Sequence, residues 1–156
     1  MGGYNSGRSG GRSTVESCAF VLDITHLRRS GCLVPEATCR SQITWTGEDG
    51  AVLLTITPRA RLAQQRGTLT LAYERADYWT GRVHQIETTL DLVATAQPLG
   101  GQRCWIVCPR TGRRVTKLYL PSGALRFSSR HAYRLAYQSQ RETPSNRALR
   151  RALAPP

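Results

Sequence analysis

The chain has 156 residues, and its 22 Lys and Arg against 10 Asp and Glu give a formal net charge of +12. With 40% hydrophobic residues it can offset the entropy of ordering a core, which excludes an acidic disordered protein. No run of about 18 apolar residues occurs, and the Gly/Ser/Arg-rich start lacks the apolar stretch of a secretory signal. We therefore expect a cytoplasmic protein that does not bind membranes.

Residues 1–13 predict a flexible arm, and residues 14–97 predict an antiparallel β domain. Runs of apolar and β-branched residues predict its strands, over 17–24, 42–46, 51–57, 67–73 and 84–94. A short helical turn is expected from Thr25, as its cap, to Gly31, and a loop or short helix over 58–66. These helical stretches are too short for parallel crossovers, so the sheet should be antiparallel.

Residues 98–142 predict a second, smaller unit. It should contain strands over 104–107 and 115–120, an extended stretch over 125–127 and a helix over 131–142. Residues 143–156 predict a basic tail with a helix over 145–153. The expected fold class is mainly β, a β-rich α+β arrangement.

The excess positive charge lies almost entirely in the last third of the chain. Residues 101–156 hold 11 arginines, Lys117 and one acid, Glu142, a net charge of +11, whereas residues 1–100 hold ten arginines and nine acids, a net charge of +1. Tyr119, Tyr133 and Tyr137 are interleaved with these cations. Cations among aromatics are typical of proteins that bind single-stranded or irregular nucleic acid. The predicted phosphate contacts are Arg113, Arg114, Lys117, Arg130, Arg134, Arg141, Arg147, Arg150 and Arg151. Two alternatives stay open: the charge can serve solubility alone, and each tyrosine can be a core residue.

Five cysteines, an odd number, argue against a disulfide framework, and we expect Cys18 and Cys32 to be small buried apolar residues. Residues 104–137 place two turns about 20 residues apart at strand ends, which is the layout of a zinc ribbon. Of its four ligand positions only Cys108 is a thiol, because Thr111, Ser129 and Ala132 occupy the others. We expect a degenerate ribbon without cofactor, while a rearranged zinc site built on Cys104, Cys108 and His131 stays open as an alternative.

Specific segments at both ends of the chain match a pattern seen in other proteins. They are residues 4–16, 27–35, 108–109, 112–115, 117–119, 127, 130–131, 133, 135, 137 and 139–142. In these segments the chain resembles a family of small, uncharacterised bacterial proteins, common in alphaproteobacteria and often found near mobile elements. The resemblance implies a C-terminal zinc ribbon, from which this sequence departs at three ligand positions.

We expect a nucleic-acid-binding protein of a mobile element such as a phage. The alternative is a protein-binding module, an inhibitor or accessory of a host or defence nucleoprotein complex, whose N-terminal sheet contacts its partner through an edge strand such as 67–73. His26, His84 and His131 are far apart, and no nucleotide-binding or hydrolase motif occurs, so we do not expect an enzyme.

Overall fold

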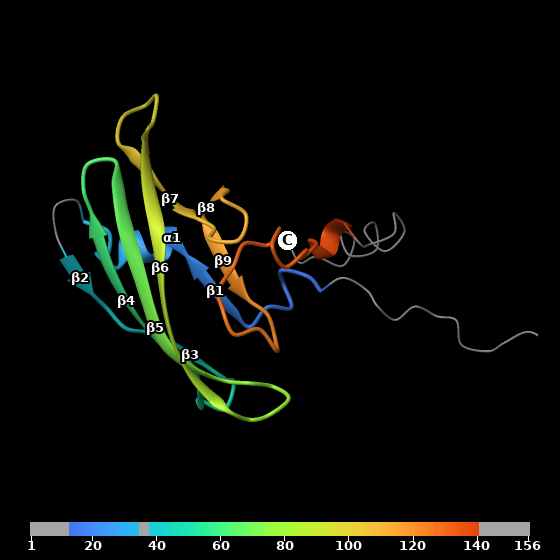
Figure 1. Cartoon of the computed structure of the whole chain (residues 1–156). Helices are drawn as coiled ribbons and strands as arrows, with labels where there is room; N and C mark the ends of the chain where they lie inside the picture. Colours follow the sequence, from blue (N-terminus) through green and yellow to red (C-terminus); the bar gives the residue numbers. More distant parts are fainter. Residues whose placement is uncertain (1–12, 35–37, 141–156) are drawn as a thin grey trace, which may run out of the picture.

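A computed structural model of the chain describes residues 13–34 and 38–140, which form a mainly β structure (Figure 1). The predicted β-rich fold class is confirmed. The strands are β1 Phe20–Asp23, β2 Thr38–Arg40, β3 Ile43–Thr46, β4 Val52–Leu62, β5 Arg66–Ala76, β6 Val83–Ala96, β7 Gln102–Val107, β8 Arg114–Val115 and β9 Lys117–Leu120. The helices in the described part of the chain are α1 Ile24–Arg29 and the 3-10 turn η1 Gln138–Gln140.

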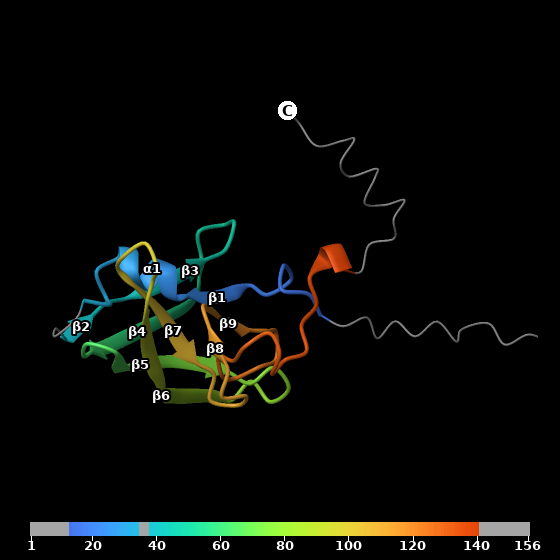
Figure 2. The ribbon, with the colours of Figure 1, turned by 90° about the horizontal axis from the view of Figure 1, so that it is seen from above.

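Seven strands form one curled antiparallel sheet in the order β2-β4-β5-β6-β7-β8, and β3 pairs with another stretch of β4. Side chains alternate between its faces, so Leu69 and Leu71 of β5 and Leu90 and Leu92 of β6 are buried while the residues between them are not. The inner face is therefore apolar. β1 and α1 lie across from β5 and β6 and cover this face (Figure 2).

The C-terminal strands complete the same structure. β7 pairs with β6, and β9 pairs with β1 in a separate two-stranded sheet, with Asp23 opposite Lys117. Leu118, Leu120 and Phe127 belong to one core together with Phe20 and Leu27. The described residues thus share a sheet and a core across the boundary expected at 97/98.

Three local predictions are wrong. The loop or helix expected over 58–66 is limited to a loop over 63–65, because β4 continues through Pro58 to Leu62. The carbonyl oxygen of Pro58 accepts the N–H of Ser41, at the junction between β2 and β3. The proline nitrogen, which carries no hydrogen, faces the same side of β4 as this carbonyl. The proline therefore removes no hydrogen bond between β4 and β5. The cap of α1 is Asp23, whose side chain accepts the N–H of Thr25, and not Thr25 itself.

The third wrong prediction is the helix over 131–142. Residues 131–134 form a turn, Ala136 makes an isolated β-bridge with Thr14, and η1 is the only helical stretch in the described part of 131–142. Leu135 N donates to Arg130 O and Arg134 has a φ of 52°, so the chain curls into a compact turn. The arm before residue 13 and the helix over 145–153 lie outside the described residues. Within residues 13–34 and 38–140, no helix is long and apolar enough to cross a membrane.

The edge strand proposed for partner binding is also wrong, because β5 is hydrogen-bonded to β4 on one side and to β6 on the other. Residues 67–73 therefore offer no free backbone for strand addition. Cys18 and Cys32 are buried among apolar residues, which confirms their expected place in the core.

Candidate nucleic-acid interface

A cavity of about 450 Å³, which we call the groove, opens where the chain passes from β8 into β9. Thr116 joins the two strands, and its carbonyl oxygen accepts the N–H of Ile24, which fixes the bend against β1 and α1. The groove is lined by Val15, Glu16, Val21, Trp105, Arg114, Val115, Thr116, Lys117, Tyr119, Arg130, His131 and Tyr137. Residues from both ends of the described chain therefore build it.

Three cations line the groove: Arg114, Lys117 and Arg130. Arg114 and Lys117 are exposed, and the Lys117 ammonium lies 3.4 Å from the Asp23 carboxylate. Arg130 lies 5.0 Å from the centre of the Tyr137 ring. These side chains place positive charge where a solvent-borne anion can reach it.

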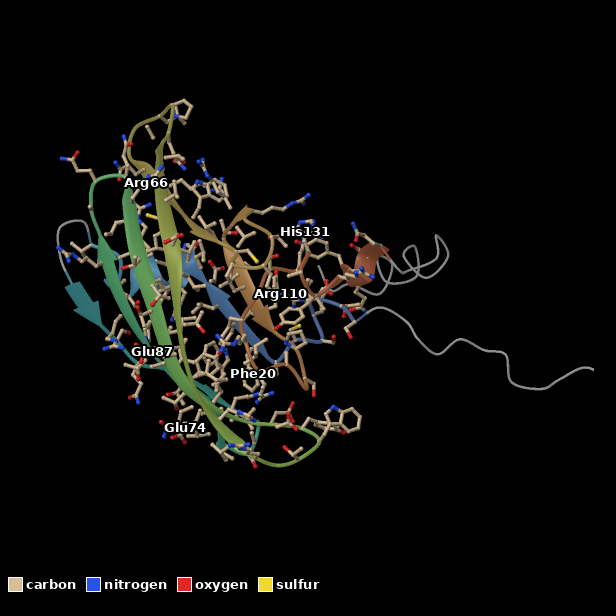
Figure 3. The ribbon with its side chains drawn as sticks, viewed as in Figure 1. Phe20, Arg66, Glu74, Glu87, Arg110 and His131 are labelled. Atoms are coloured by element: carbon tan, nitrogen blue, oxygen red, sulfur yellow. The ribbon has the colours of Figure 1, made fainter. Side chains whose placement is uncertain are left out.

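His131 adds a titratable group at the same site (Figure 3). Desolvation, followed by the positive charges of Arg130 and Arg113, lowers the pKa of His131 below its ordinary value. The imidazole is therefore mostly neutral at pH 7, where it can accept or donate a hydrogen bond but adds little charge.

Two aromatic rings supply flat surfaces in the groove. Trp105 lies on the face of β7 opposite to the buried Cys104 and Ile106, and its indole N–H donates to Thr95 Oγ1 at 2.9 Å. The Arg103 guanidinium stacks over the Trp105 ring at 4.2 Å, and Tyr137 is exposed. Tyr119 is buried, so it forms the wall of the groove and offers no free ring face.

Glu16, the acid that lines the groove, already has a hydrogen-bond partner. Glu16 accepts the backbone N–H of Gln138 at 3.0 Å, which ties the N-terminal segment to η1. Asp23, which does not line the groove, accepts the N–H of Thr25 at 2.8 Å and pairs with Lys117. Cations outnumber acids among the lining residues, and the site keeps a positive balance.

Of the nine predicted phosphate contacts, the structure brings Arg114, Lys117 and Arg130 together in the groove. Arg113 is exposed on the neighbouring turn, and Arg134 lies in the turn that follows His131. The other four, Arg141, Arg147, Arg150 and Arg151, lie outside the described residues. Sequence reasoning missed Trp105 as a groove residue, although the alternation of β7 places it opposite Cys104 and Ile106.

The two turns expected to form the ribbon lie against each other. Cys108 Sγ accepts the N–H of Ser129 at 3.4 Å and lies 3.9 Å from Ser128 Oγ, and the N–H of Ala132 donates to Ser129 Oγ at 3.3 Å. Burial raises the pKa of the Cys108 thiol, but hydrogen bonds from the Ser129 and Thr111 side chains and from two backbone N–H groups outweigh it and lower the pKa to about 6. Hydrogen bonds to one thiolate therefore join the turns.

The donor set at these turns does not fit zinc. A structural zinc takes four nitrogen or sulfur ligands, whereas positions 108, 111, 129 and 132 supply one thiolate, two hydroxyls and a methyl group. The rearranged alternative is not assembled either: Cys104 is buried in the main core, while His131 is exposed at the groove. Among residues 13–34 and 38–140, no group of three His, Cys, Asp or Glu is placed to hold a metal ion.

Comparison of the chain with protein-family models, with curated proteins and with solved structures finds no significant match.

Proposed function

We propose that the protein binds nucleic acid through the groove, as a component of a mobile element. The observation that carries the proposal is the convergence of Arg114, Lys117 and Arg130 beside the rings of Trp105 and Tyr137. Cations supply the sequence-independent attraction to phosphates, and accessible ring faces supply stacking for bases.

The chemistry favours phosphate contact over catalysis. The groove's carboxylate, Glu16, is bonded to a backbone N–H, and no group of three metal-ligating side chains is present at its histidine within the described residues. Cys108 is fully buried at the turns and does not line the groove. A binding role uses the lining residues as they stand.

The test is the salt dependence of binding. Labelled single-stranded and duplex oligonucleotides, titrated with the full chain at about 50 mM salt, should bind with a log K that falls linearly with log salt. Neutralisation of three phosphates by the groove cations predicts a slope of about −2 on a single strand. Failure of both oligonucleotides to bind, or a flat salt profile, contradicts the proposal.

A second candidate function is protein binding, favoured by the tip of the β5–β6 hairpin. Tyr78 and Trp79 are 69% and 86% exposed, and their rings contact each other with centroids 5.2 Å apart. Asp77 holds this turn by accepting the N–H groups of Trp79 and Thr80. A rigid exposed aromatic pair is typical of a protein–protein hot spot, which suits an inhibitor or accessory of a host nucleoprotein complex.

We expect the variant Tyr78→Ser/Trp79→Ser to keep the thermal stability and oligonucleotide affinity of the wild type. The variant should fail to capture proteins that the wild-type chain captures from nuclease-treated host lysate, since aromatic anchors dominate such contacts. Unchanged capture by the variant would remove the hairpin tip as a binding site.

A further inference from the structure

A second cavity of about 260 Å³ adjoins the groove and shares two lining residues with it, Thr116 and Lys117. Its other cations are Arg28 of α1 and Arg103 of β7. Lys117 therefore stands on the boundary between the two cavities and faces both. The basic surface continues from Arg130 past Lys117 toward Arg28.

Contacts hold the two added arginines in place. The Arg28 guanidinium donates to the carbonyl oxygen of Gln102 at 2.8 Å, and the Arg103 guanidinium stacks on Trp105 at 4.2 Å. Trp105 lines the groove while Arg103 lines the second cavity, so this stacked pair bridges the two. Side chains fixed in this way lose less entropy when they bind a phosphate.

Asp23 is the one acid that lines the second cavity, and both of its interactions are internal. Its carboxylate accepts the N–H of Thr25 and pairs with Lys117. A phosphate that approaches Arg28 and Arg103 therefore meets a carboxylate whose charge is partly offset. The remaining neighbours include the uncharged side chains of Gln97 and Thr25.

We infer that the groove and the second cavity form one track that binds an extended single strand of nucleic acid, with Arg28 and Arg103 as additional phosphate contacts. The inference rests on the proposed function and deepens it. A single strand fits because the rings of Trp105 and Tyr137 line the groove, and bases stack on aromatic rings only when they are unpaired. A mononucleotide fills one cavity at most, whereas a strand engages cations on both sides of Lys117.

Length dependence tests the track. Fluorescence anisotropy would compare oligothymidylates of about 3 and about 12 nucleotides, lengths below and within the usual range of single-strand sites. The longer oligonucleotide should bind wild-type chain at least about tenfold more tightly, because it reaches two further cations. Arg28→Gln/Arg103→Gln should remove most of this gain in affinity and lower the salt slope for the longer oligonucleotide by about 1.4. The affinity of the shorter oligonucleotide should not change. Arg61→Gln/Arg66→Gln, which removes two exposed cations that line neither cavity, is the matched control and should change neither length.

Because the bond from Arg28 to Gln102 also supports the fold, a second variant keeps the test independent of stability. Gln97→Glu places a negative charge in the second cavity and leaves Arg28 and Arg103 intact. This variant should bind the longer oligothymidylate more weakly than the wild type does and bind the shorter one with unchanged affinity. Equal affinity of the two lengths for wild-type chain, or tighter binding of a duplex of the longer length, overturns the track while the proposed function stands. Absence of binding by every oligonucleotide overturns both.

Discussion

At the residue scale, Cys108 and Lys117 each connect parts of the chain that are far apart in sequence. Cys108 joins the two turns through the N–H of Ser129, and Lys117 lies opposite Asp23 between the two cavities. Sequence reasoning selected both residues from their position in a pattern. The partners that give them their roles come from long-range pairing, which spacing along the chain does not encode.

The lowered pKa of Cys108 predicts a pH-dependent stability. Its thiol has a pKa of about 6 in the folded chain against an ordinary value of 9.0, so the unfolded chain binds the extra proton between these values. The thiolate therefore stabilises the fold above pH 9, and this contribution is lost as the pH falls through about 6. Denaturant unfolding at pH 5 and pH 7 should show that wild type gains about 1 kcal/mol over Cys108→Ala across this range.

Cys18→Ala is the matched control for that measurement. Burial raises the pKa of the Cys18 thiol, so it stays protonated in both states over the same pH range. The stability difference between wild type and Cys18→Ala should therefore stay constant from pH 5 to pH 7. A constant difference for Cys108→Ala as well would mean that the Cys108 thiol keeps its proton.

At the element scale, alternation of apolar residues predicted the central strands, and tertiary contacts decided their lengths. The pattern over 67–73 and 84–94 lies inside β5 and β6, whose pairing continues over the longer register from Arg66–Val93 to Ala76–Val83. Pro58 predicted the end of a strand, yet β4 continues beyond it, because the proline removes no hydrogen bond from the pairing with β5. In the described part of 131–142 the chain turns instead of forming the expected helix, because Leu135 packs against Cys18 and Tyr119 and the N–H of Leu135 donates to Arg130 O.

The β4–β5 hairpin depends on the absence of a side chain at Gly67. A Cβ atom there would lie 2.3 Å from the Arg61 carbonyl oxygen and 2.8 Å from Leu62 Cα, and backbone atoms cannot move aside without breaking the pairing. We expect Gly67→Ala to lower the free energy of unfolding by at least about 2 kcal/mol. Thr68→Ala, at an exposed position of the same strand, should cost less than about 1 kcal/mol. Similar urea midpoints for the two variants would contradict the close approach.

At the scale of the whole molecule, the charge pattern predicted the character of the site but not its construction. Arg114, Lys117 and Arg130 come from the basic segment 101–156, as expected. Val15, Glu16, Val21 and Arg28, however, come from the nearly neutral N-terminal part. The pairing of β1 with β9 brings these segments together. A prediction that divides the chain into two separate units at 97/98 does not include this pairing.

The central claim is that the groove, and not the total charge of +12, binds nucleic acid. The most direct measurement compares two variants that lose the same charge, Arg114→Gln/Lys117→Gln/Arg130→Gln and Arg61→Gln/Arg66→Gln/Arg82→Gln. The second set is exposed and lines neither cavity. The groove variant should lower single-strand affinity at least about tenfold at low salt and reduce the salt slope by about 2, while the control changes affinity less than about twofold. Equal losses for the two variants would contradict the account.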